Sequence, residues 1–257
     1  MRLQYATEND RVENFSGVAD PILERISDCI TASGCIRDRP ALVDPGGSWT
    51  YGQLQDTTDQ MESWLLYLGI RAGDRVMIVA ENCRALIAMI FALARLDACA
   101  ALVSATRSPK EVDQIKTLCV PRRIFYMINV SEAAKRHAAR DGADVADAID
   151  WGPIAFGPLN ENAAPQIVSS ETSNRVVAEV YSRDPGELRS EKLTHQYLLR
   201  VANACTRISG LTSGSPLYGS LPMCDGLGLS GVLLPSLLTG GTVCLSRNSQ
   251  RVGELKP

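Results

Sequence analysis

Hydrophobic positions along the chain switch between two spacings, one typical of buried strands and one typical of helices. Residues Arg75–Ala80 form a short apolar run, which predicts a strand buried on both faces. Apolar residues recur at helical spacing over 52–68, where Gly69 is suited to end the helix, and again over 83–97. A further apolar run over 99–103 predicts the next strand. Strands that alternate with helices predict parallel pairing through crossover helices.

The alternation continues through the rest of the sequence. Ser108–Glu111 predicts a helix start, because Ser can cap free amides, Pro suits the first turn and Glu lies three residues after the cap. The segment 152–172 is rich in Pro, Asn, Ser and Gly, which predicts a long loop or a subdomain boundary. The other predicted elements are a hairpin over 41–51, strands over 123–128, 176–181, 217–221 and 242–246, and helices over 131–141, 194–208 and 229–238. We therefore predict an α/β fold with a layered, doubly wound sheet and crossover helices.

Composition and charge narrow the classes of function. The chain has 257 residues, of which 45% are hydrophobic and 21% are charged, so it can bury a sizeable core. A formal net charge of −3 gives no electrostatic footprint for nucleic acid, and we expect neither DNA nor RNA as a partner. The segment 1–16 is polar where a signal peptide needs an apolar stretch, and 85–96 is too short to span a bilayer. These features favour a cytoplasmic protein without a membrane span.

The cysteines do not follow a metal-binding or disulfide pattern. The chain contains no CxxC pair and only two histidines. We therefore expect no metal site and interpret the cysteines as small apolar core residues that stay reduced. They are Cys29, Cys35, Cys83, Cys99, Cys119, Cys205, Cys224 and Cys244.

Five segments in a fixed order resemble recurring phrases of the adenylate-forming (AMP-binding) superfamily, in its acyl-CoA synthetase or carboxylate–CoA ligase branch. The segments are Arg39–Leu54, Leu68–Cys83, Ser108–Ile115, Leu193–Leu199 and Leu221–Leu245. No single phrase is decisive, but five of them in family order are specific. The resemblance covers the N-terminal portion of such enzymes, which continue for roughly as many residues again, so it implies a truncated N-terminal domain of the adenylate-forming fold.

The resemblance also implies a chemistry. In the family, a carboxylic acid substrate attacks the α-phosphorus of ATP to give an acyl-adenylate and pyrophosphate, and the thiol of CoA then takes the acyl group. Such a reaction needs hydrogen-bond donors around a developing polyanion. Family members supply part of them from a Ser/Thr/Gly-rich loop, typically Y-T-S-G-T-T-G-x-P-K-G-V, whose amides, hydroxyls and lysine surround the phosphates. ATP, Mg and CoA are the family's cofactors.

The segment that takes the place of this loop departs from the pattern. It runs from Tyr181 to Lys192 and reads YSRDPGELRSEK, one residue shorter than the family loop. Asp184 and Glu187 stand where glycines would let the backbone approach phosphate, so we predict a degraded loop that repels ATP. The residues assigned to this degraded phosphate site are Tyr181, Ser182, Gly186 and Thr194. The alternative interpretation is that cationic side chains compensate as phosphate ligands, namely Arg183, Arg189 and Lys192.

A second group of residues resembles the family's acyl pocket. The assigned pocket residues are Met223, Cys224, Asp225 and Gly228, and Asp225 stands where the family commonly has histidine or an aromatic residue. His195 matches a family position at a helix start, where we interpret it as a structural or capping residue rather than a catalytic one.

These features define three segments and two classes of function. The segments are an N-terminal extension with a helix over 1–38, a first α/β segment over 39–168 and a second α/β segment over 169–257. The resemblance implies an ATP-dependent carboxylate–CoA ligase of fatty acid metabolism, which we expect to be inactive as it stands, with no catalytic residue assigned and none of the cofactors bound. The alternative is a non-catalytic homologue that acts as an interaction partner of another synthetase, in a homo- or hetero-oligomer, or as an acyl-binding module.

Overall fold

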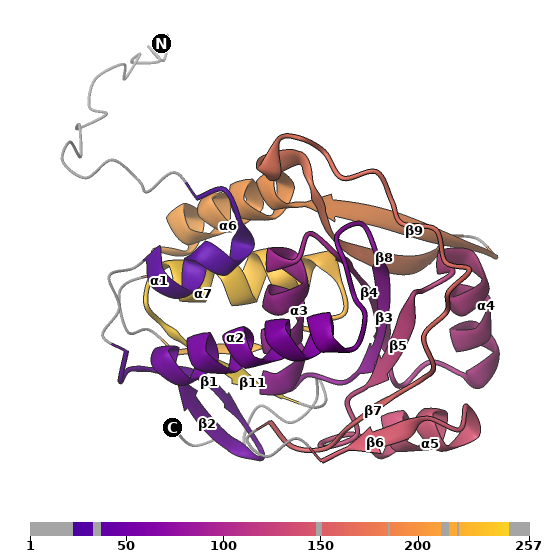
Figure 1. The fold of residues 1–257 in the computed structure, drawn as a ribbon. Helices are drawn as coiled ribbons and strands as arrows, with labels where there is room; N and C mark the ends of the chain where they lie inside the picture. Colours follow the sequence, from indigo (N-terminus) through magenta and orange to yellow (C-terminus); the bar gives the residue numbers. More distant parts are fainter. Residues whose placement is uncertain are drawn as a thin grey trace, which may run out of the picture.

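Two sheets and the helices around them build the part of the chain that the structure describes (Figure 1). This computed structural model describes residues 23–32, 37–147, 151–184, 186–211, 216–219 and 221–246. The larger sheet has seven strands in the order β6-β7-β5-β3-β4-β8-β9, and the smaller sheet has four in the order β10-β11-β1-β2. Each sheet combines strands from the segments 39–168 and 169–257.

Four parallel strands form the centre of the larger sheet. They are β3 (Arg75–Ala80), β4 (Cys99–Ser104), β5 (Arg123–Tyr126) and β8 (Val176–Asp184). The strands β6 (Asp144–Ala146), β7 (Ile154–Phe156) and β9 (Glu187–Thr194) extend the sheet on its two sides by antiparallel pairing. The sheet is therefore mixed, with a parallel centre as the alternation of strands and helices predicts.

Helices cover both faces of the larger sheet. Val76 and Ile78 of β3 belong to the apolar core that contains α3 (Arg84–Arg95), whereas Met77 and Val79 belong to the core that contains residues of α4 (Pro109–Cys119). Successive side chains of a strand point to opposite faces, so one continuous apolar strand supplies both cores. The prediction of a layered, doubly wound α/β fold is confirmed.

The smaller sheet joins the beginning and the end of the described chain. It consists of β1 (Pro40–Asp44), β2 (Gly47–Thr50), β10 (Pro216–Gly219) and β11 (Thr242–Leu245). β1 pairs with β2 as the predicted hairpin and, on its other side, lies parallel to β11. The hydroxyl of Tyr51 donates to the backbone oxygen of Gly241 at 2.7 Å, which fixes the start of α2 (Tyr51–Tyr67) next to β11.

Local sequence signals explain where the helices begin and end. Thr50 accepts the N–H of Gln53 at the start of α2, and that helix ends before Gly69, whose φ of +87° suits a glycine. Ser108 and Glu111 form the predicted capping box at the start of α4. The remaining helical elements are η1 (Ile26–Asp28), α1 (Cys29–Ala32), α5 (Glu132–Arg140), η2 (Thr172–Asn174) and α6 (His195–Ser209).

The helix predicted over 229–238 is present, and it begins as a π-helical segment, η3 (Gly228–Leu233), that continues into α7 (Leu234–Leu238). Pro235 lies just after the junction of η3 and α7, where its missing N–H removes one hydrogen bond to the preceding turn, in agreement with the change of helix type there. The prediction of an irregular segment over 152–172 was wrong in part. This segment contains β7, whose three apolar residues pair with β5 and extend the sheet. None of the helices in the described ranges is long and apolar enough to cross a bilayer.

Candidate functional site

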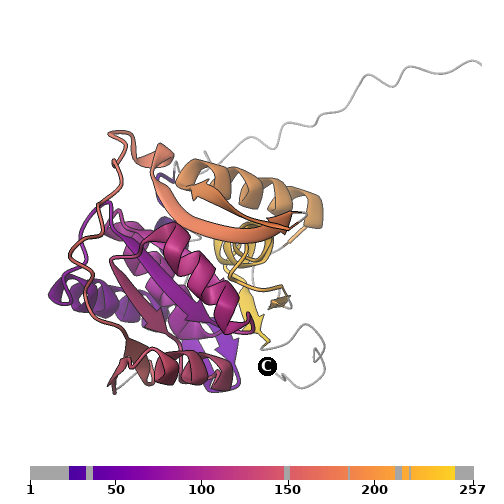
Figure 2. The ribbon, with the colours of Figure 1, turned by 90° about the vertical axis from the view of Figure 1, so that its right-hand side faces the viewer.

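The segment predicted to be a degraded phosphate loop is a β-hairpin, and the prediction of a loop there was wrong. β8 and β9 pair antiparallel up to the last pair, Asp184 with Glu187. Only Pro185 and Gly186 separate the two strands, and Gly186 has a φ of +91° that favours glycine. The ladder continues to this last pair, so the N–H and C=O groups that face the partner strand are paired with each other. Figure 2 shows the hairpin below α6.

The four residues assigned to the phosphate site do not come together. Tyr181 is buried in the core on the α4 side of the sheet, whereas Ser182 is exposed on the next position of β8. Gly186 lies at the tip of the hairpin. Thr194 lies at the other end of β9, roughly 27 Å from Gly186 for eight residues of extended strand. There its hydroxyl accepts the N–H of Tyr197 and caps α6.

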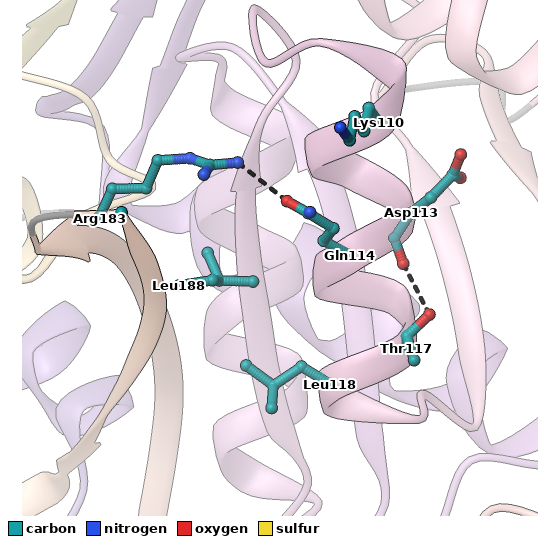
Figure 3. A pocket seen from close by; sticks show the side chains of 8 residues that line it. Lys110, Asp113, Gln114, Thr117, Leu118, Arg183 and Leu188 are labelled. Atoms are coloured by element: carbon teal, nitrogen blue, oxygen red, sulfur yellow. Dashed lines mark hydrogen bonds between the residues drawn. The ribbon is translucent and has the colours of Figure 1, made fainter.

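Two arginines hold the hairpin against α4. Arg183 of β8 donates from Nε to the Glu111 carboxylate at 3.1 Å and from Nη2 to the Gln114 side-chain oxygen at 2.9 Å, as Figure 3 shows for the second contact. Arg107 donates to the backbone oxygen of Tyr181 at 2.6 Å and lies 3.6 Å from the same carboxylate. The sequence identified Glu111 only as a capping residue, because no local pattern shows that α4 packs beside the hairpin.

Glu111 is held in its charged form by these neighbours. The Ser108 hydroxyl and the Ser108 backbone N–H donate to one carboxylate oxygen at 2.8 and 3.0 Å. Those hydrogen bonds, followed by the one from Arg183, lower the pKa of Glu111 from 4.5 to about 2. The carboxylate is therefore ionised at any pH near neutrality.

An open groove of about 820 Å³ lies between α4 and the hairpin (Figure 3). Its lining combines Lys110, Asp113, Gln114, Thr117 and Leu118 of α4 with Arg183, Gly186 and Leu188 of the hairpin. Asp113 is already paired with Arg140, whose Nη2 lies 2.7 Å from it. The groove thus presents apolar surface with cationic groups and no phosphate cradle of small residues.

The described residues do not fit the phosphates of ATP at the hairpin. A phosphate cradle needs several backbone N–H groups that converge on the ligand. In β8 and β9, successive N–H groups point alternately toward the partner strand and away from it, so they do not converge. Arg183 is engaged by α4, and Lys192 lies far along β9, exposed and opposite Glu179. Within the described part of the chain, no group of three or more His, Cys, Asp or Glu side chains could hold a metal ion.

The residues assigned to the acyl pocket do come together, in a turn at the carboxyl end of β3. Met223 is fully buried, and the Cys224 thiol lies 3.7 Å from the backbone oxygen of Ala80. Asp225 accepts the N–H of Gly228 at 2.7 Å and so caps η3. Burial raises the pKa of Cys224 to about 12, which keeps it a neutral thiol.

Asn82 fixes this turn to the larger sheet. Its side-chain nitrogen donates to the backbone oxygen of Leu221 at 2.9 Å, and its oxygen accepts the N–H of Met223 at 2.8 Å. At Gly228, a Cβ would stand 2.1 Å from the backbone oxygen of Pro222, so only glycine fits. Crevices at the carboxyl ends of parallel strands are where open α/β sheets bind ligands.

His195 is a buried structural residue at the start of α6. Its Nδ1 accepts the N–H of Ile26 at 3.1 Å, so the imidazole anchors the N-terminal helical turn. Burial, assisted by the positive charge of Arg25, lowers the pKa of His195 from 6.5 to about 4. Arg25 and Arg175 both pair with Asp97, at 2.6 and 2.9 Å. This environment agrees with a structural interpretation of His195 and leaves it neutral near pH 7.

The described cysteines are free thiols, and most are buried. Cys29, Cys83, Cys99, Cys119 and Cys244 are buried, as expected of small apolar core residues. Cys205 and Cys224 are half-buried, and Cys35 lies outside the described residues.

Comparison with known proteins gives the family. The model of the family described as "AMP-binding enzyme" matches residues 32–184, more than half of the chain, and the match ends at the last residue of β8. An acyl-CoA synthetase of Gibberella moniliformis, FUM10, is 30% identical over 236 residues, which are 79% of this chain and 42% of that protein. The chain therefore spans less than half the length of this relative.

Solved structures agree on the fold. The inhibitor-bound N-terminal domain of FACL13 from Mycobacterium tuberculosis superposes with a TM-score of 0.69 at 18% identity, covering 88% of this chain and 58% of that chain. ATP-bound MatB from Rhodopseudomonas palustris gives a TM-score of 0.65 at 17% identity, covering 88% of this chain and 45% of that chain. The chain belongs to the AMP-binding enzyme family, the adenylate-forming family of acyl-CoA and other carboxylate ligases.

Proposed function

We propose that this chain is a homologue of ATP-dependent carboxylate–CoA ligases whose hairpin does not hold the phosphates of ATP, so that the chain by itself performs no adenylation. One observation carries the proposal: β8 and β9 pair up to Asp184 and Glu187 in the segment that takes the place of the family's phosphate loop. The fold around the hairpin is that of the family, so the loss concerns the chemistry and not the architecture.

The charges at the hairpin support this proposal. The turn is flanked in sequence by Asp184 and Glu187, which repel a polyphosphate. Arg183, the nearest cation on β8, already donates to Glu111 and Gln114. The family match also ends at residue 184, where the hairpin turns. An ATP molecule would therefore meet two acidic residues beside the turn, where the N–H groups that face the partner strand are already paired in the β8–β9 ladder.

Thermal unfolding in the presence of ATP and Mg²⁺ tests the proposal. A ligand at a hundred times its dissociation constant adds about 2.7 kcal/mol to the free energy of unfolding, which raises the melting temperature by several degrees. We expect no shift and no pyrophosphate release with a panel of fatty and other apolar carboxylic acids. A clear shift, or pyrophosphate formed at the expense of ATP, would show that the hairpin accepts the nucleotide.

A second candidate function is the binding of an acyl group without its activation. The turn that contains Met223 and Cys224 lies at the carboxyl end of β3, where open α/β sheets bind ligands, and Asn82 holds it there. Calorimetric titration with an acyl-CoA and with the corresponding free acid would detect this activity. Binding of either compound without ATP favours the acyl-binding module, and absence of binding removes it.

A further inference from the structure

We propose that Arg107 and Arg183 form an oxyanion site that the chain's own Glu111 fills, and that this internal counter-ion locks the β8–β9 hairpin onto α4. Glu111 lies 3.1 Å from Arg183 and 3.6 Å from Arg107. The proposal goes beyond the loss of ATP binding, because it names the contact that keeps these two cations from other anions.

The contact geometry is that of an anion held between two guanidinium groups. One oxygen of Glu111 faces both arginines, and the other accepts the hydroxyl and the N–H of Ser108. Charge-assisted hydrogen bonds of this kind are stronger than neutral ones. A carboxylate on a helix is also already at the site, so it loses less freedom on binding than a dissolved anion would.

The same contacts position the hairpin. Arg183 belongs to β8 itself, and Arg107 donates to the backbone oxygen of Tyr181 on that strand. Both arginines therefore connect the hairpin to the segment that carries Glu111. Removing the charge of Glu111 would weaken one ion pair of each arginine at once and loosen the hairpin.

The site is within reach of a dissolved ligand. The side chain of Arg183 is 41% exposed, and the side chain of Lys110, on the lining of the adjoining groove, is exposed as well. No ion pair or hydrogen bond of the Lys110 side chain is found among the described residues. A small oxyanion such as pyrophosphate could contact both arginines and Lys110 once the carboxylate charge is gone, since guanidinium groups bind phosphate oxygens in pairs.

Glu111→Gln is the decisive variant, because glutamine can keep the capping box while it removes the charge. We expect the hairpin amides over 181–190 to exchange their hydrogens several-fold faster in this variant. We also expect it to bind inorganic pyrophosphate at least tenfold more tightly than the unsubstituted chain, measured by calorimetry at low salt, where phosphate contacts are strongest. Adding Arg183→Gln should abolish the gain.

Two controls separate this effect from net charge and from helix capping. Glu132→Gln changes the net charge equally, but Glu132 lies at the start of α5 and pairs with Lys135 at 2.6 Å. Ser108→Ala disturbs the cap of α4 and leaves the carboxylate charge in place. Neither control should gain pyrophosphate binding. Unchanged hairpin exchange together with unchanged pyrophosphate affinity in Glu111→Gln would overturn the inference, whatever the unsubstituted chain does with ATP.

Discussion

The turn at Met223, which packs at the carboxyl end of β3, and the tip of the β8–β9 hairpin lie at the same end of the strands of the larger sheet. They are built in opposite ways. In the first region, Met223 is buried, and its turn is held by Asn82, a buried residue about 140 positions earlier in the chain that bonds to Leu221 and Met223. The tip of the hairpin is exposed and is held by side chains of α4. Contacts between residues far apart in the sequence therefore hold the family fold in the first region. The exposed tip depends on few such contacts, so its sequence can vary without unfolding the domain.

The largest expected effect separates the buried core around α3 from the hairpin. Phe91 of α3 is fully buried, and Phe91→Ala should lower the free energy of unfolding by about 4 kcal/mol through lost burial and a cavity. Leu188 of the hairpin is only half-buried, and Leu188→Ala should cost about 1 kcal/mol or less. Urea unfolding of both variants measures the contrast. Similar costs would mean that the hairpin belongs to the core.

Acid should lower the free energy of unfolding through His195, which directly follows β9 at the base of the hairpin. His195 has a lowered pKa of about 4, so unfolded chains bind more protons than folded ones between pH 6.5 and 4. The stabilisation is complete above pH 6.5 and is lost as the pH falls toward 4, by at most about 3 kcal/mol. Urea titrations at pH 7 and pH 4.5 on the unsubstituted chain and on His195→Asn should show a smaller loss in the variant. An equal loss would assign the acid sensitivity to other groups.

The stability of the turn at Met223 should depend strongly on one side chain, that of Asn82. Asn82→Ala leaves the backbone oxygen of Leu221 and the N–H of Met223 without this partner, and should cost about 2 kcal/mol. Asn82→Asp keeps an acceptor for Met223 and serves as the matched variant, with a smaller loss expected. Thermal unfolding compares the two. If Asn82→Ala were neutral, the turn would be held by packing alone.

The smallest expected effect lies at the tip of the hairpin. Gly186 has a φ of +91°, and a Cβ there would meet no atom within 4 Å, so Gly186→Ala should cost about 1 kcal/mol from backbone strain alone. Gly157→Ala is the control, since the nearest atom to its Cβ would be 4.0 Å away and its φ is ordinary. Thermal melts should separate the two variants by a few degrees. Equal melting temperatures would argue against the left-handed turn.

The sequence was a good guide where local signals and tertiary structure agree. The capping box at Ser108 and the apolar run of β3 predicted their elements, because caps and continuous burial are encoded by adjacent residues. The π-helical geometry of 228–233 and the short β7 were missed, since neighbouring elements decide how such segments pair. The division into 39–168 and 169–257 remains a prediction.

The candidate site was less predictable than the fold. The residues around Met223 lie together, whereas the residues assigned to the degraded phosphate site are spread along an antiparallel hairpin, and their assignment remains a prediction. The role of Glu111 depends on α4 packing beside the hairpin, a contact with Arg183 across 72 residues of sequence. A contact of that kind leaves no local pattern to read.

Hydrogen exchange of the amides over 181–190, with and without ATP and Mg²⁺, tests the central claim most directly. A closed ladder predicts that the amides paired between β8 and β9 are protected in the free chain and that the nucleotide leaves their exchange unchanged. An open phosphate loop predicts fast exchange that slows when the nucleotide binds. The second result would contradict the closed hairpin and would show that this chain binds the nucleotide.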